Sequence, residues 1–152
     1  MPERVGCAPL GTLAAAARYR PACNDNVDEG TEKVMADSGL FIGFGNAARG
    51  RERQAMQGFN DVFEYYSRLQ QEGQIESFEP VLLEPHGGDL AGFFLLRGDL
   101  DKLARIRGSE EFERHTARAL LCVENIGVVS AALGERLMSQ MSVFGEQIGE
   151  LT

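Results

Sequence analysis

The sequence predicts an α+β domain with a four-stranded antiparallel sheet, because segments typical of strands and of helices alternate along it. The stretch 78–99 contains two apolar segments joined by a tight turn, Pro-His-Gly-Gly-Asp, at 85–89, as expected of neighbouring strands. The second segment, Leu90–Arg97, is apolar at nearly every position, whereas a strand with one solvated face alternates. We therefore expect this strand to be buried on both faces.

A strand, a helix and a second strand are expected before this turn. Leu40–Phe44 is a short apolar run, and the loop 45–50 follows it. Apolar residues then recur every three or four positions until Gly73, which is typical of an amphipathic helix. The stripe consists of Met56, Phe59, Val62, Phe63, Tyr66 and Leu69. The next strand is expected at about Ile75–Leu83, at a sheet edge because it contains Pro80.

Two helical segments are expected after the third strand. Asp99 can cap the first, Leu100–Arg107, and Ser109 can cap its continuation through about Ala117. Gly108 separates the two.

A fourth strand and a last helix complete the pattern. The strand is expected to begin at Leu120–Val123 and to reach about Val129, and the helix to span about Gly134–Leu151. The apolar side of the helix consists of Leu137, Met141, Phe144, Ile148 and Leu151. Strand, helix, strand, strand, helix, strand is the ferredoxin-like order, and right-handed crossovers place both internal helices on one face of the sheet.

The other face of the sheet also requires burial. In the first, third and fourth expected strands, large apolar residues stand next to each other and so point to opposite faces of the sheet. These pairs are Leu40/Phe41, Phe93/Phe94 and Leu120/Leu121. One terminal helix is too narrow to cover four strands. We therefore expect a second copy of the chain to stack its sheet on this face, giving a homodimer.

The charge and the cysteine content argue against several kinds of partner and site. The chain has 152 residues and a formal net charge of −8, which argues against nucleic acid or an anionic membrane as partner. Its three cysteines, Cys7, Cys23 and Cys122, are odd in number and lack metal-ligand spacing, so neither a disulfide framework nor a zinc site is expected. We expect reduced thiols and a cytoplasmic location.

Residues 1–36 differ from the rest and are expected to form a disordered tail before a folded domain at 37–152. A secretory signal is disfavoured, because the run 8–17 is poor in Leu, Ile and Val, contains Pro and Gly, and is followed by charges. Met35 as the true start of the protein is an alternative.

The element order and the stretch E-P-H-G-G-D-L-A-G-F-F-L-L-R-G-D at 84–99 resemble the dimeric α/β-barrel superfamily. That superfamily includes small cofactor-free monooxygenases, muconolactone isomerases, YciI-like proteins, ligand-sensing domains of transcription regulators and haem-handling enzymes. The stretch is also similar to that of uncharacterised bacterial proteins of this class. The resemblance implies a dimeric barrel but carries over no catalytic residue.

The expected topology gathers three segments at one end of the sheet, namely 46–53, 84–89 and 115–118, so both histidines could share one rim. His86, with Asp89 to orient it and Glu84 beside it, is the candidate general base. The alternatives are a solvated His86 in an ordinary turn and metal ligation by Glu-x-His-x-x-Asp; a single local imidazole disfavours the metal.

The basic residues Arg49 and Arg51, before the first helix, are the candidate anion-binding groups. Solvated charges paired with Glu52 are the simpler interpretation. His115 is expected at the surface, Tyr65 to pack amphipathically beside a core Tyr66, and Cys122 to be inert within a strand.

The leading hypothesis is a homodimeric small-molecule-binding protein without metal or cofactor, with a pocket between sheet and helices. If it is an enzyme, we expect proton transfer or oxygenation of an organic acid or aromatic metabolite. The alternative is a non-catalytic ligand-binding or assembly module, which the absence of conventional motifs favours. A haem enzyme is a distant third hypothesis, because His115 is the only histidine expected on a helix and its charged neighbours indicate a solvated position.

Overall fold

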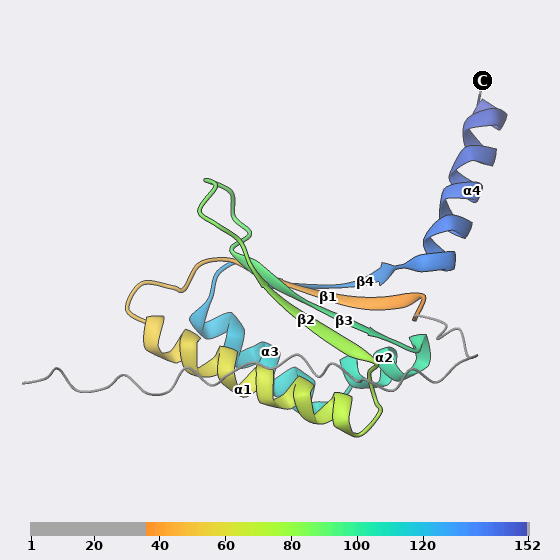
Figure 1. The fold of residues 1–152 in the computed structure, drawn as a ribbon. Helices are drawn as coiled ribbons and strands as arrows, with labels where there is room; N and C mark the ends of the chain where they lie inside the picture. Colours follow the sequence, from red (N-terminus) through yellow and green to blue (C-terminus); the bar gives the residue numbers. More distant parts are fainter. Residues whose placement is uncertain (1–35, 152) are drawn as a thin grey trace, which may run out of the picture. The chain divides into compact units, whose positions relative to one another are not determined.

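Four strands and four helices follow one another in the computed structural model, which describes residues 36–151 (Figure 1). The expected tail and the Met35 start lie outside the described residues. The elements are β1 (Ser38–Phe44), α1 (Glu52–Gln71), β2 (Ser77–Leu82), β3 (Gly92–Gly98), α2 (Leu100–Arg107), α3 (Glu110–Cys122), β4 (Gly127–Ala132) and α4 (Gly134–Leu151).

The strands form one antiparallel sheet in the order β2-β3-β1-β4. Phe41 in the central strand β1 faces Leu95 of β3 on one side and Val129 of β4 on the other. The helices α1, α2 and α3 all lie on one face (Figure 1). The α+β class and the ferredoxin-like order are confirmed.

The two predicted caps are confirmed where the chain leaves β3. The Asp99 side chain accepts hydrogen bonds from the backbone N–H groups of Asp101 and Lys102, and the Ser109 side chain accepts one from Phe112 N–H. These bonds satisfy donors that the first turn of a helix leaves without a partner. They explain why α2 and α3 form two segments around Gly108.

The predicted start of the fourth strand is wrong. Leu120 and Leu121 belong to α3, which continues to Cys122, and β4 begins only at Gly127. Leu and Ala are strong helix formers, and a four-residue apolar run does not by itself distinguish a strand from the end of a helix. Leu120 and Leu121 are exposed, and Cys122 is a half-buried free thiol at a helix end rather than a strand residue.

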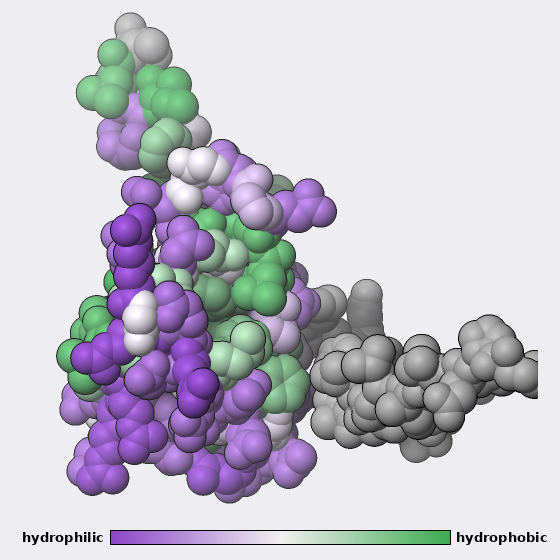
Figure 2. Space-filling model, turned by 90° about the vertical axis from the view of Figure 1, so that its left-hand side faces the viewer, coloured by the Kyte–Doolittle hydropathy of each residue, from purple (hydrophilic) through white to green (hydrophobic). Residues whose placement is uncertain are grey.

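Helix α4 has the predicted bounds but does not cover the sheet. It rises from the face opposite α1, α2 and α3 and stands clear of the strands (Figure 1). None of its residues is buried, and apolar side chains colour its surface at the top of Figure 2. No helix in residues 36–151 combines the length and the apolar character needed to cross a membrane.

The sheet face that α1, α2 and α3 leave uncovered, here called the open face, is mainly apolar. Strand pairing places on it Phe41, Val81, Phe93, Leu95, Val129 and Ala131. The rings of Phe41 and Phe93 are 5.0 Å apart between centroids. An Arg97–Glu79 ion pair, with Nε 3.8 Å from Oε1, lies at its edge.

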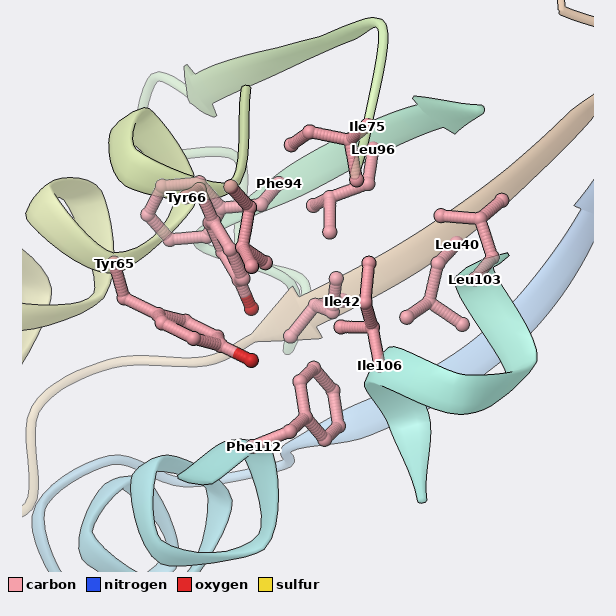
Figure 3. Close-up of a cluster of buried hydrophobic side chains, with 11 residues drawn as sticks. Leu40, Ile42, Tyr65, Tyr66, Ile75, Phe94, Leu96, Leu103, Ile106 and Phe112 are labelled. Atoms are coloured by element: carbon pink, nitrogen blue, oxygen red, sulfur yellow. The ribbon is translucent and has the colours of Figure 1, made fainter. Parts of the chain in front are cut away.

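The core lies between the helices and the covered face of the sheet (Figure 3). Its largest fully buried side chains are Leu40 and Leu96, which face each other across β1 and β3. Both Tyr65 and Tyr66 are buried, although the sequence predicted one core tyrosine. Helix α1 packs against α3 as well as the sheet, so each tyrosine has a neighbour: Tyr66 packs on Phe94, and Tyr65 faces α3.

Candidate functional site

The loop after β1, the β2–β3 hairpin and the end of α3 meet at one end of the sheet, but the third segment is Cys122–Glu124 rather than the predicted 115–118. Backbone hydrogen bonds join Gly45 N–H to the carbonyl of Glu124 (2.7 Å) and Ala48 N–H to that of Cys122 (2.9 Å). The Ala91 N–H binds the Phe44 carbonyl (2.8 Å). The loop after β1, the β2–β3 hairpin and the end of α3 are therefore held together at their bases.

His86 is engaged with its own hairpin. Its Nδ1 accepts a hydrogen bond from Gly88 N–H (3.1 Å), and its Nε2 lies 2.9 Å from the Leu90 carbonyl. An Nδ1 that accepts cannot carry the proton of a neutral ring, so Nε2–H donates to Leu90. Both ring nitrogens thus stabilise the turn, and neither is left to abstract a proton.

Within residues 36–151, neither Glu84 nor Asp89 forms a side-chain hydrogen bond or ion pair with the imidazole of His86, whose partners are Gly88 and Leu90. All three residues are exposed. No three or more His, Cys, Asp and Glu side chains in this part of the chain form a group that could hold a metal ion. The geometry therefore favours a structured hairpin tip over a preassembled acid–base or metal centre.

Arg49 and Arg51 lie in the loop that leads from β1 to α1. This loop turns toward the helices, whereas the hairpin rises on the other side of the sheet (Figure 1). Glu52, the expected partner of these arginines, instead accepts a hydrogen bond from Gly50 N–H (3.0 Å). Its own backbone N–H and that of Gly50 lower the pKa of Glu52. The arginines and His86 share one end of the sheet without converging on one point.

Apolar surface accompanies these polar groups. Viewed from this end, green apolar areas are framed by purple polar residues (Figure 2). In the elements that meet at this end, four large apolar side chains have more than half of their surface exposed: Met56, Leu82, Leu120 and Leu121.

A shallow groove between α3 and the edge strand β4 was not predicted from the sequence. Its volume is about 300 Å³, and it is lined by Arg107, Phe112, Glu113, Thr116, Ala117, Leu120 and Val128. Assigning Leu120 to a strand concealed it. The spacing of Phe112, Thr116 and Leu120, four residues apart, is the signal that would have placed them on one face of a helix.

His115 does not join His86 at this end, contrary to expectation. Its ring stacks on Tyr65 with centroids 4.8 Å apart, and Arg68 lies over the same tyrosine while its guanidinium binds Glu111 of α3 (2.5 Å). These contacts tie α1 to α3. His115 is half-buried rather than at the surface.

Acidification is expected to destabilise the fold through His115. Burial lowers the pKa of His115, and Arg118 and Arg68 lower it further against the opposing charges of Glu111 and Asp61. The unfolded chain then binds this proton more readily than the folded one, so stability is full above the ordinary value of 6.5 and declines as the pH falls below it. Urea unfolding at pH 7 and pH 5 should show this loss of stability in the wild type and a smaller loss in His115→Gln. An equal loss in the two proteins would contradict the role of His115.

Comparison with known proteins adds little beyond the fold. No protein-family model matches the sequence, and no curated protein matches it. One similar solved structure is a dimeric protein of unknown function with a ferredoxin-like fold from Bacteroides fragilis. It is 13% identical, with a TM-score of 0.48 over 65% of this chain and 99% of that one. A likeness this distant carries no conclusion about partners or activity.

Proposed function

We propose that the protein is a homodimeric small-molecule-binding protein in which a second copy covers the open face of the sheet. One observation carries the proposal: the open face presents Phe41, Phe93, Leu95 and Val129, and α4 stands clear of it (Figure 1). Complete burial of one such side chain is worth about 1.5–3 kcal/mol. A face with several of them is typical of a protein interface.

The position of the hairpin supports a ligand site at one end of this interface. The hairpin rises from the same side of the sheet as α4, at the opposite end (Figure 1). A second sheet on the open face would therefore lie beside Glu84, His86 and Asp89. Phe41, Phe93 and Leu90 would provide apolar walls, which suit an aromatic metabolite.

Binding is the better supported role for this site than catalysis. A general base needs a free acceptor nitrogen, and both nitrogens of His86 are used by its own hairpin. A catalytic role, with Asp89 as the orienting carboxylate, requires the ring to leave these bonds when a ligand enters.

The interface is tested by placing a charge on each side of the same edge strand. Val129 is 54% exposed on the open face, so Val129→Glu should leave the monomer folded and prevent dimerisation, because an uncompensated buried charge costs about 3–5 kcal/mol. The matched control is Ser130→Glu, because Ser130 is the next residue, is exposed and points to the opposite face.

Sedimentation equilibrium measures the result, with circular dichroism to verify folding. We expect wild type and Ser130→Glu to be dimers and Val129→Glu to be a monomer. A Val129→Glu dimer with wild-type affinity would contradict the proposed interface.

A further inference from the structure

Helix α4 carries an apolar stripe that its own sheet does not bury. The stripe residues Leu137, Met141, Phe144 and Leu151 step by three, four and seven positions, and more than two fifths of each is exposed. The opposite side of the helix carries Glu135, Glu146 and Glu150. Such a helix normally packs its apolar side against another surface.

The chain fixes the direction in which α4 leaves the sheet. Leu133 N–H binds the Asp37 carbonyl (2.8 Å), and the Arg136 guanidinium donates to the Ser38 hydroxyl (3.0 Å). Gly134, between them, has φ +48°, which glycine adopts more easily than other residues. The helix is thus anchored to β1 at its base.

The apolar surface is continuous from the open face to the base of α4. A Cβ atom on Gly39, in the central strand, would lie 3.0 Å from Leu133 Cδ1 and 3.3 Å from Leu95 Cδ1. Leu133 therefore packs on the open face, one residue before α4 begins. A partner that covers the open face would therefore also contact the base of α4.

Helix α4 would add substantially to the area that the open face offers to a second copy. Strands of six or seven residues, about 4.8 Å apart with a rise of about 3.3 Å per residue, give a flat area of roughly 400 Å². A stable interface buries about 800 Å² per partner. The 18 residues of α4 form a rod about 27 Å long and 10 Å wide, which adds roughly 270 Å².

We propose that α4 is the second part of the dimer interface and packs its apolar stripe on the second copy of the chain. This inference rests on the homodimer proposed above. Stacked sheets lie about 10 Å apart, so a helix of about 27 Å that rises from the open-face side reaches past the second sheet. The two α4 helices would then hold the two copies together at the ends of the sheets.

Charge disfavours a membrane surface as the occupant. Helices that lie on anionic membranes carry Lys and Arg on their polar face, whereas α4 has three glutamates and a single arginine, Arg136, which is already bound to Ser38. A second copy requires no such basic face.

The test compares two neighbouring positions of α4 in the full-length protein. Phe144 lies on the stripe and Val143 lies about 100° away from it around the helix, and both are more than half exposed. We expect Phe144→Glu to raise the dimer dissociation constant at least about tenfold, and Val143→Glu to leave it within about twofold. Amide hydrogen exchange of α4 provides a second measurement: protection should be present in the dimer and lost in the monomeric Val129→Glu variant.

The outcomes separate the two proposals. If the wild type is a monomer, the homodimer itself is wrong. If Val129→Glu dissociates the dimer but Phe144→Glu and Val143→Glu have equal dimer dissociation constants, the sheet interface stands and the role of α4 is overturned. Protection of α4 that persists in the Val129→Glu monomer would also overturn it, because the helix would then be protected without a second copy.

Discussion

Leu96→Ala is expected to lower the free energy of unfolding by about 2–5 kcal/mol. Leu96 is 0% exposed, and it lies opposite Leu40 in the centre of the sheet. Truncation removes its contacts with Leu40 and with the helices above, and neighbouring strands cannot collapse into the space without breaking their hydrogen bonds. A loss of this size is a large part of the stability of a small domain.

Urea unfolding at one fixed protein concentration measures the effect of Leu96→Ala, because a dimer's stability depends on concentration. The control is Leu120→Ala, since Leu120 is 61% exposed and should lose less than about 1 kcal/mol. Equal losses for the two variants would contradict the position of the core.

Gly92→Ala is expected to destabilise the protein by about 1–3 kcal/mol or more, because the added methyl group has no space. Leu96→Ala, in contrast, leaves a space empty. A Cβ atom at Gly92 would lie 2.5 Å from the Val81 carbonyl oxygen and 2.7 Å from the Phe44 ring. The carbonyl belongs to the backbone of the neighbouring strand, so it cannot move aside as the end of a flexible side chain could. The first residue of β3 must therefore remain glycine for β2 and β3 to pair.

Gly127→Ala provides the comparison for Gly92→Ala. Gly127 also begins a strand, and a Cβ atom there would meet no atom within 4 Å. Thermal unfolding should show a clear decrease in Tm for Gly92→Ala and almost none for Gly127→Ala. A Gly92→Ala variant as stable as the wild type would mean that the β2–β3 pairing differs from the one described.

The fold was largely predictable because its local signals agree with its tertiary structure. Asp99 and Ser109 cap helices whose apolar residues also face the sheet, and α4 has the bounds that its periodicity indicated. The fourth strand was placed too early because the apolar run at Leu120 is equally suited to the end of a helix. Only tertiary packing determines that the chain continues in α3 before it turns.

The candidate site was predictable as a set of segments but not as a set of side-chain contacts. Antiparallel topology brings the loop after β1 to the base of the hairpin whatever its residues are. The hydrogen bonds of His86 to Gly88 and Leu90 depend on the backbone path of the turn, which residue types alone do not determine. The burial of Tyr65 likewise depends on the approach of α3.

Native mass spectrometry of the full-length protein, purified gently from its own cells, tests the central claim most directly. We predict a particle of twice the subunit mass, with a retained small molecule if the end of the interface holds the ligand site. A particle of one subunit mass at micromolar concentration would contradict the account, because the apolar open face would then need no second copy to cover it.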